Sequence, residues 1–310
     1  MSLMITPHFL QSTAWEKFQN NLGRRTIRRQ GDGWSYLAVV EHTAGMTRLY
    51  CPYGPTVESI KALERALLSL RSEAKTERAA YLRIQPVGVD LNTTTLIGHK
   101  LRAVDYSQPE ATRLIDLSRP LDEIYADISQ SKRSICRNYQ NKGLVYSSSY
   151  DPKDIDKLLP LLHEVAVRNQ ISIHSDNYLR TQANALIPDH ASLHFMKFED
   201  DIIASALVFE DATTNYYAHA GNTNQHRNLS ANTALVGELI RRAKDQGKLF
   251  FDLYGVAPTD DPSHPWAGVS RFKESFGGYM VKYNHTYEIG LSTIPYAIYR
   301  FARQLVRFKR

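Results

Sequence analysis

Three clusters of basic side chains are the part of this sequence whose type and spacing point most directly to binding chemistry. The chain has 310 residues and a formal net charge of +6, and much of that charge is local. A dense group of cations attracts a polyanion such as RNA, a diphosphate or an anionic membrane surface. Each cluster could also be an ordinary solvated face. The clusters are Arg24, Arg25, Arg28 and Arg29; Lys132, Arg133, Arg137 and Lys142; and Arg300, Arg303, Arg307, Lys309 and Arg310.

The cysteines and histidines argue against a metal centre. Cys51 and Cys136 are too few for a disulfide framework, and neither stands in a metal-ligand spacing. The 11 histidines include no His-Glu-x-x-His pair and no Cys/His cluster. We therefore expect neither a metal nor a resident cofactor.

The hydropathy pattern argues against membrane insertion and secretion. No window offers about 18 apolar residues without a charge, so no membrane-spanning helix is expected. The first residues, Met1 to Met4, lack the basic start and apolar core of a secretory signal. We expect a cytoplasmic protein.

The predicted elements repeat once along the chain, which suggests two copies of one α/β unit. Apolar residues at helical or alternating spacing, with turn and cap residues between them, mark the elements of the first copy. These are a helix at 11–22, strands at 34–41 and 47–51, a helix capped near Thr56, strands at 81–84 and 113–117, and a helix that begins at Ser118 and stops by Gly143.

The second copy follows the same order, and the boundary between the copies is predicted near 145–151. Its first helix begins at Asp151, and a basic C-terminal helix follows its last strand. Between them lie strands at 193–198, 202–209 and 215–220, a helix from Ser230 to Gly247, a strand at 249–254 and a long strand at 279–289.

One pair of segments is specific enough to indicate a family. The stretch Phe250–Val256, followed after a short loop by Gly268–Gly278, resembles the signature of the FemABX family, which are peptidoglycan aminoacyltransferases that use aminoacyl-tRNA. Three further stretches resemble the same family in the same order, and together they cover nearly the whole chain. They are Phe9–Ser12 with Trp15, Tyr53–Pro55, and Asp116–Ser118 with Ser131–Arg137 and Lys142–Gly143.

The resemblance implies an α+β fold with two tandem acetyltransferase-like (GNAT) domains, each a mixed sheet flanked by helices. It assigns residues 1–147 and 290–310 to the first domain and residues 148–289 to the second. Members with a lipid-linked acceptor often carry an inserted two-helix arm, for which the stretch from Ser230 to Gly247 leaves no room. The chain therefore resembles the armless, FemX-like members, whose acceptor is the soluble UDP-MurNAc-pentapeptide. A lipid-linked precursor is the other acceptor considered.

The reaction implied by the resemblance is transfer of an amino acid from aminoacyl-tRNA to an amine of the stem peptide. The protein must align the two substrates and stabilise the oxyanion that forms, and a fixed cation suits that task. Lys273, which matches the family's lysine, is the catalytic candidate. Outside this motif it would be interpreted as a lysine at the edge of a strand or turn. The base for the amine is left open between the substrate itself and Asp252.

Tyrosines near the predicted site could stack on a sugar or a base. Neighbours on a strand alternate faces, so only one of Tyr216 and Tyr217 can face the site, and the resemblance favours Tyr217. Tyr254 is a further candidate for substrate binding, and the resemblance adds Tyr178. Arg271 could hold a phosphate or an acidic neighbour.

The segment Arg83–Pro86 departs from the family pattern, which has an acidic residue where Gln85 stands. An amide can donate and accept hydrogen bonds but cannot pair with a cation, so the acceptor's identity is left open. Arg83 lies two residues earlier on the same strand face and could contact a diphosphate. Otherwise it is an exposed strand charge.

Two of the basic regions suggest partners. Lys132, Arg133 and Arg137 could bind the phosphates of tRNA. The C-terminal helix has arginines on one face and an apolar stripe on the other, which would suit peripheral contact with a membrane. We favour the simpler alternative that the stripe covers the first domain. The stripe is Ile294, Ile298, Phe301 and Leu305.

Two other functions are kept as alternatives. An acetyl-CoA-dependent N-acetyltransferase would place a glycine-rich loop at a helix N-terminus to approach the pyrophosphate, and the corresponding stretch Gln225–Asn232 contains no glycine. A non-enzymatic RNA-binding protein would use the basic clusters alone. Replacement of Lys273 separates these functions, because binding would survive it and transfer would not.

Overall fold

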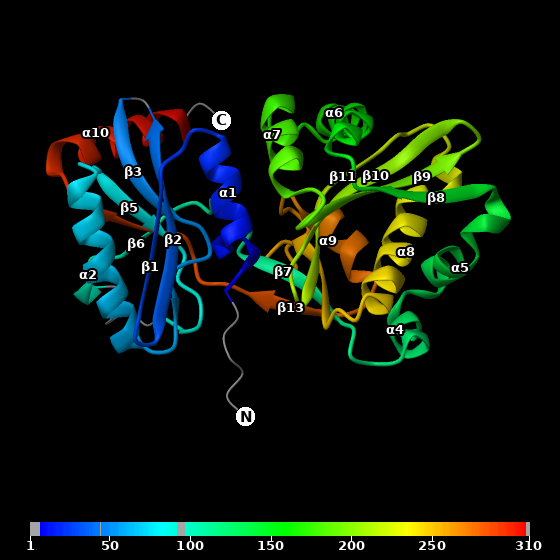
Figure 1. Ribbon diagram of the computed structural model, residues 1–310, viewed down its shortest axis with the longest axis horizontal. Coiled ribbons are helices and arrows are strands. Elements are labelled where there is room, and N and C mark those ends of the chain that lie inside the picture. The colour runs from blue at the N-terminus through cyan, green and yellow to red at the C-terminus, as the bar shows by residue number, and fades with distance from the viewer. Residues whose placement is uncertain (1–6, 44, 92–96, 308–310) are drawn as a thin grey trace. The chain divides into compact units, whose positions relative to one another are not determined.

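The computed structural model describes residues 7–43, 45–91 and 97–307, and its contacts divide the chain into two compact units. Unit 1 comprises residues 1–110 and 283–310, and unit 2 comprises residues 111–282. Each unit contains one seven-stranded sheet with helices packed against it (Figure 1). The prediction of a mixed α+β fold with two sheets flanked by helices is confirmed.

The sheet of unit 1 has the strand order β1-β2-β3-β5-β14-β6, with β4 paired to β2. Strands β3 and β5 are parallel, and the other pairs within this sheet are antiparallel. The strands are β1 (Thr26–Gly31), β2 (Trp34–Thr43), β3 (Met46–Cys51), β4 (Thr56–Val57), β5 (Tyr81–Ile84), β6 (Arg102–Ala103) and β14 (Tyr287–Gly290), and the helices are the 3₁₀ helix η1 (Phe9–Gln11) and the α-helices α1 (Thr13–Asn21), α2 (Ile60–Thr76) and α10 (Thr293–Arg307).

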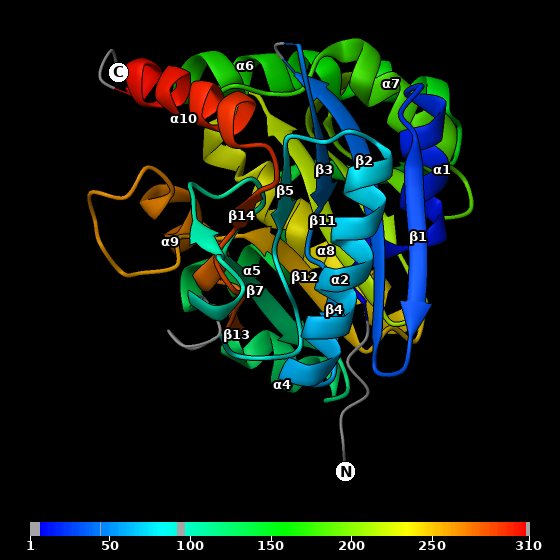
Figure 2. The same cartoon turned by 90° about the vertical axis from the view of Figure 1, so that its left-hand side faces the viewer.

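Helix α2 shows how the sequence builds unit 1. The Ser59 side chain accepts a hydrogen bond from the Ala62 amide and caps the helix, so the cap predicted at Thr56 is wrong and that residue lies in β4. Leu63, Leu67 and Leu70 recur at helical spacing and are fully buried in the core of the unit. Figure 2 shows α2 lying along the sheet, with α10 in red across the top of that view.

The sheet of unit 2 has the strand order β13-β7-β12-β11-β10-β9-β8. Strands β11 and β12 are parallel, and the other neighbours are antiparallel. The strands are β7 (Ala111–Asp116), β8 (Leu144–Ser149), β9 (Ala191–Phe198), β10 (Asp201–Glu210), β11 (Thr214–Asn222), β12 (Phe250–Gly255) and β13 (Tyr279–Lys282); the helices are α4 (Leu121–Asp127), α5 (Gln130–Asn138), α6 (Leu159–Asn169), α7 (Asp176–Leu186), α8 (Ala231–Asp245) and α9 (Ala267–Glu274), with 3₁₀ helices η2 (Tyr139–Lys142), η3 (Pro152–Lys157) and η4 (Arg227–Leu229).

The division between the units falls earlier than the predicted boundaries at 147 and 290. Strand β7 pairs with β12 and β13, and β8 pairs with β9, so both strands belong to the second sheet. Helix α5 packs on α8, where the Cys136 thiol lies 3.6 Å from the Thr233 carbonyl oxygen. Long-range pairing of this kind leaves no mark in a local sequence pattern, and it assigns residues 111–147 to unit 2.

The long strand predicted at 279–289 is two strands in two different sheets. Strand β13 pairs with β7 in unit 2, whereas β14 pairs with β5 and β6 in unit 1. The predicted helix from Ser118 to Gly143 is likewise divided into α4, α5 and η2. The chain therefore leaves unit 1 after residue 110 and returns to it at Tyr283.

Helix α10 belongs to unit 1, as predicted, but a different face of it is packed. Ile294, Ile298 and Phe301 are exposed. The expectation that this stripe covers the first domain is therefore wrong for these three residues, and Leu305 lies outside the described side chains. The hydroxyl groups of Tyr296 and Tyr299 make the contacts with the unit instead.

Candidate active site

Strand β12 carries a bulge where the most specific sequence motif begins. Asp252 is paired with Leu114 and Gly255 with Thr112. Between these two pairs, β12 therefore has one residue more than β7. Tyr254, within the bulge, has φ 64°, which is left-handed and uncommon for a residue with a Cβ. Bulges of this kind redirect side chains next to active sites.

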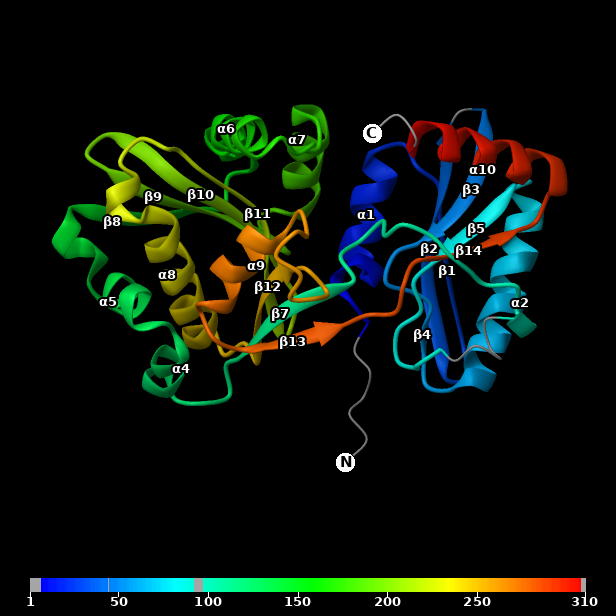
Figure 3. The same cartoon turned by 180° about the vertical axis from the view of Figure 1, so that it is seen from behind.

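Helix α9 follows this bulge and ends in a turn that needs two glycines. Gly277 and Gly278 have φ values of 81° and 70°. A Cβ at Gly277 would lie 2.6 Å from the Cβ of Asp127, and one at Gly278 would overlap the Leu114 carbonyl oxygen. The Arg113 guanidinium donates hydrogen bonds to both glycine carbonyl oxygens, at 2.8 and 2.9 Å. The turn is thus attached to β7, and it fixes the end of α9 (Figure 3).

Lys273 lies in the last turn of α9 and is 8% exposed. Its ammonium group donates a hydrogen bond to the Gly255 carbonyl oxygen at 2.7 Å, which connects the helix to the bulged strand. Burial lowers the pKa of Lys273 to about 8, and the charge of Asp252 opposes that shift. The bulge therefore fixes the position of a buried ammonium group whose pKa lies close to neutral pH.

Asp252 is the second buried charge of this cluster and is 3% exposed. Its Oδ1 accepts hydrogen bonds from the Thr112 hydroxyl and from the Tyr254 amide, the latter at 2.6 Å. Burial raises the pKa of Asp252 to about 6, and these hydrogen bonds and Lys273 oppose the shift. An acid and a base whose pKa values are both moved toward neutrality form a candidate site for proton transfer.

The two tyrosines of β11 lie on opposite faces of the sheet. Tyr216 is the register partner of Asp252 and so shares its face, and its hydroxyl donates to Asp211 Oδ2 at 2.8 Å. Tyr217 lies in the core against α8, and its hydroxyl donates to Asn232 Oδ1 at 2.7 Å. The structure therefore does not bring Tyr217 to Asp252, although the sequence analysis favoured it over Tyr216.

Tyr178 joins the face of Asp252 through a group of aromatic rings. Its ring stacks on His174 at 4.0 Å between centroids, and His174 meets His219 edge-on at 5.9 Å. His219 also meets Phe209 edge-on at 5.8 Å, and Phe209 is the register partner of Tyr216. Tyr178 is half-buried in the first turn of α7. One stacked and two edge-on ring contacts thus connect Tyr178 to the sheet face that carries Asp252.

Arg271 and Tyr254 are the other predicted residues of this region. Arg271 lies two residues before Lys273 on α9 and is exposed, and within the described part of the chain its guanidinium makes no hydrogen bond or ion pair. It is free to hold an anionic group of a substrate. Tyr254 is half-buried and follows Asp252 by two residues on the bulged strand.

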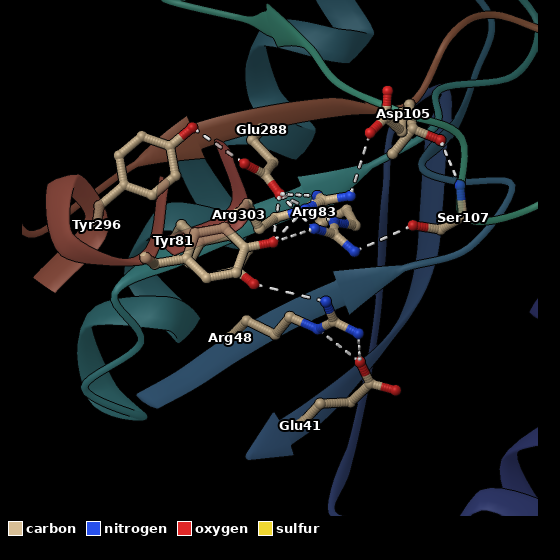
Figure 4. A network of polar contacts seen from close by, with 11 residues as sticks. Glu41, Arg48, Tyr81, Arg83, Asp105, Ser107, Glu288, Tyr296 and Arg303 are labelled. Carbon is tan, nitrogen blue, oxygen red and sulfur yellow. Dashed lines mark hydrogen bonds and ion pairs between the residues drawn. The ribbon is translucent and has the colours of Figure 1, made fainter. Parts of the chain in front are cut away.

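Arg83 is neither exposed nor available for a diphosphate, which corrects the expectation for it. It is 6% exposed, and its guanidinium pairs with Glu288 at 2.5 Å and donates to Ser107 and Tyr299 at 3.1 and 2.6 Å (Figure 4). Gln85 is 1% exposed and donates to the Asn284 carbonyl oxygen at 3.1 Å. Its Oε1 has no hydrogen-bond partner among the described residues.

The predicted tRNA-binding cations lie on α5 and make contacts within unit 2. Lys132 donates to Ser275 Oγ at 2.5 Å and lies 4.1 Å from the centre of the Phe272 ring, so it holds α5 against the end of α9. Arg133 donates to backbone carbonyl oxygens at the end of α4. Arg137 forms an ion pair with Asp122 at 2.9 Å and is exposed. These contacts account for the first two cations without a ligand.

Two groups of the site, Thr112 and the Gly255 carbonyl, were not singled out from the sequence, and Tyr216 was considered but set aside in favour of Tyr217. Thr112 comes from a strand 140 positions before Asp252, and such a pairing has no local signal. The position of the Gly255 carbonyl group depends on the bulge in β12. Whether the Tyr216 side chain lies at the site depends on which face of β11 is covered. The run of aromatic and glycine residues after Asp252 was the available hint of an irregular strand.

Comparison with known proteins agrees with the resemblance seen in the sequence. A model of the FemAB family matches residues 194–304. This region includes the bulged strand β12 and the whole of α9. A search among curated proteins finds no match.

Solved structures share the fold of the chain at low sequence identity. The crystal structure of FemX has a TM-score of 0.80 at 19% identity, with 94% of each chain covered. L-PGS from Bacillus licheniformis has a TM-score of 0.58 at 12% identity, with 98% of each chain covered. A tandem GNAT protein from the clavulanic acid biosynthesis pathway has a TM-score of 0.52 at 13% identity. The match covers 84% of this chain and 81% of that protein's chain. These structures show a fold of the tandem GNAT kind.

Proposed function

We propose, from the match of a FemAB family model to residues 194–304, that this chain is a peptidoglycan bridge aminoacyltransferase. The donor in this proposal is aminoacyl-tRNA, and the acceptor is an amine on the stem peptide of a peptidoglycan precursor. The observation that carries the proposal is the buried pair Asp252 and Lys273, joined through the Gly255 bulge.

In the proposed reaction, the aminoacyl group passes directly from tRNA to the acceptor amine. The acceptor amine forms a C–N bond to the ester carbonyl carbon, and the C–O bond to the tRNA 3′ oxygen breaks. Asp252, ionised above a pH of about 6, takes the proton from the amine. Lys273 stabilises the oxyanion and gives its proton to the leaving oxygen, for which a pKa of about 8 is well matched.

No covalent enzyme intermediate is needed. The ester is already activated, so alignment of the two substrates and charge stabilisation suffice. Both cysteines, Cys51 and Cys136, are buried, and burial raises the pKa of each thiol, which makes them poor nucleophiles.

Substrate binding in this proposal uses the side chains around the pair. Arg271 holds an anionic group, while Tyr254 and Tyr178 line the acceptor, with Tyr216 taking the place first given to Tyr217. Arg137, with help from the charges of Lys132 and Arg133, contacts tRNA phosphates. Helix α8 has 15 residues and is followed closely by β12, which favours the armless kind of member and a nucleotide-linked acceptor.

The test is mass spectrometry of UDP-MurNAc-pentapeptide after incubation with the protein and a pool of charged tRNA. A parallel reaction contains acetyl-CoA, and a third replaces the acceptor by the lipid-linked precursor. We expect a mass increase of one amino-acid residue with charged tRNA. Acetylation alone would assign the protein to the acetyl-CoA-dependent class, and no product in any tube would contradict the proposal.

A further inference from the structure

Helix α10 is attached to unit 1 by its polar face. The Tyr296 hydroxyl donates to Glu288 Oε2 at 3.1 Å, and the Tyr299 hydroxyl accepts from Arg83 at 2.6 Å. Arg303 donates to the same Tyr299 hydroxyl at 3.1 Å. Figure 4 shows Tyr296 and Arg303 of α10 and Arg83 of β5 converging on Glu288 of β14. Hydrogen bonds and ion pairs therefore attach this face of the helix to its own unit.

The buried charges beneath α10 fix this orientation. Glu288 is 1% exposed and Arg83 is 6% exposed, so neither can be rehydrated without moving the helix. Removing Tyr296, Tyr299 and Arg303 from them would leave buried polar groups without partners, which is costly. The tyrosine rings also pack on Tyr81, at 5.5 Å for Tyr296 and 4.6 Å for Tyr299. The helix is thus prevented from rolling to bury its other face.

The opposite face of α10 is apolar and exposed. Ile294, Ile298 and Phe301 are 72%, 62% and 64% exposed, and their spacing of four and three residues places them on one side of the helix. A surface helix normally turns such a stripe toward the core of its own domain. Here the stripe points away from unit 1, which indicates a partner outside it.

The sequence at this end of the chain is basic. From residue 300 to residue 310 the sequence has five basic residues and no acidic one. Arg300 lies over the Tyr296 ring at 5.9 Å, beside the stripe. A helix with an exposed apolar stripe in a basic stretch of sequence matches an interface where hydrocarbon and anionic headgroups meet.

We propose that the face formed by Ile294, Ile298 and Phe301 docks the protein on the surface of an anionic lipid bilayer. The apolar side chains enter the acyl boundary, and Arg300 contacts the headgroups. The contact proposed is peripheral, with the helix lying along the surface. Among the described residues, no helix is long and apolar enough to cross a bilayer. The proposal rests on unit 1 alone and is independent of the transferase chemistry of unit 2.

The test is co-sedimentation of the full chain with vesicles of phosphatidylcholine and phosphatidylglycerol at 3:1, compared with phosphatidylcholine alone. We expect binding to the anionic vesicles that is at least tenfold stronger than binding to the neutral ones and that weakens at 0.5 M NaCl. The double variant Ile298→Ser/Phe301→Ser should bind the anionic vesicles at least tenfold more weakly. Its thermal midpoint should be unchanged, because both side chains are exposed.

Leu68→Ser is the matched control, since Leu68 on α2 of the same unit is 65% exposed and apolar. It should bind vesicles like the parent chain. Arg300→Gln should reduce binding to anionic vesicles only. The proposal is overturned if the parent chain binds neither vesicle, or if the double variant binds as well as the parent. A concentration-dependent dimer that the double variant abolishes, without vesicle binding, would assign the face to a second copy of the chain.

Discussion

Each of the two sheets contains one parallel pair of strands, and each pair carries a buried charged residue. The two residues differ in whether the neighbouring strand supplies an opposite charge. In unit 1 the parallel strands β3 and β5 place Tyr50 beside Arg83, and the next strand places Glu288 beside Arg83. In unit 2 the parallel strands β11 and β12 place Tyr216 beside Asp252, but the next strand offers Leu114. The first charge thus has an oppositely charged register partner, and the second has none.

This difference distinguishes the structural ion pair of unit 1 from the candidate reactive site of unit 2. Arg83 and Glu288 neutralise each other within the sheet and hold α10 by hydrogen bonds. Asp252 and Lys273 are equally buried, yet no ion pair joins them among the contacts of the described residues, and burial dominates the pKa of each. Buried charges with displaced pKa values are costly to fold and are characteristic of functional sites.

Replacing the carboxylate of unit 2 should have the largest effect on activity. Asp252→Asn keeps the shape and the hydrogen bonds of the side chain but cannot accept a proton, so the transfer rate should fall by about 10²- to 10⁴-fold. The melting temperature should be equal or higher, because a buried unpaired charge is removed. Single-turnover kinetics and thermal unfolding check both expectations, and a large loss of stability would contradict the comparison.

Replacing one member of the pair in unit 1 should instead destabilise the fold. Arg83→Met removes the main ionic partner of buried Glu288 and leaves it the Tyr296 hydroxyl at 3.1 Å and Arg303 at 3.9 Å, so the loss of unfolding free energy should be at most about 3–5 kcal/mol. The double variant Arg83→Met/Glu288→Leu should recover most of this loss. Urea unfolding measures both, and full transfer activity in the double variant would confirm that the pair is an anchor. A single variant as stable as the parent would refute it.

The pH dependence of transfer should reflect the unpaired charges of unit 2. The active form has ionised Asp252 and protonated Lys273, and these coexist between a pH of about 6 and a pH of about 8. The rate should therefore rise through the lower value and fall through the higher one. A rate that keeps rising above pH 9 would show that the lysine cation is not required.

Stability should change with pH in the sense set by the same two groups. The pKa of Asp252 is raised, so the folded state binds the proton more tightly and its stability falls as pH rises toward about 6. The pKa of Lys273 is lowered, so the unfolded state binds the proton more tightly and stability rises with pH above about 8. Comparing the unfolding of Asp252→Asn with that of the parent isolates the first change.

The smallest effect concerns the cations on α5. Replacing Lys132, Arg133 and Arg137 by glutamine should reduce the slope of log affinity for tRNA against log salt by roughly 0.7 for each phosphate that the variant no longer neutralises. Arg137 should contribute most, since the other two are held by contacts within unit 2. The triple variant of Arg24, Arg25 and Arg29 is the matched control. An unchanged slope would remove α5 from the tRNA site.

The sequence predicted the elements that have a regular pattern. The strands near 34–51 and 191–222, the helix α8 and the buried stripe of α2 were all indicated by periodicity. Strand β1 was missed, because its basic run has a single fully buried residue, Ile27, as suits a strand at the edge of a sheet. The break between β13 and β14 was missed because both halves have strand propensity.

Only the site residues that lie within the sequence motif could be predicted. Lys273 was identified by resemblance, and Asp252 was named as an open alternative for the base. The pairing of Arg83 with Glu288 spans 205 positions, and no local pattern signals such a partner. The face on which Tyr216 points depends on where α8 packs, which is a property of the tertiary fold. What remained hidden was therefore contact between distant segments.

The most direct test of the account is the single-turnover rate of aminoacyl transfer by Lys273→Met beside Lys153→Met, an exposed lysine of the same unit. We predict a rate for Lys273→Met about 10²- to 10³-fold below the parent, the size expected for loss of a group that stabilises the oxyanion. The control should match the parent, and both variants should remain folded. A folded Lys273→Met with the parent's rate would contradict the assignment of the active site to unit 2.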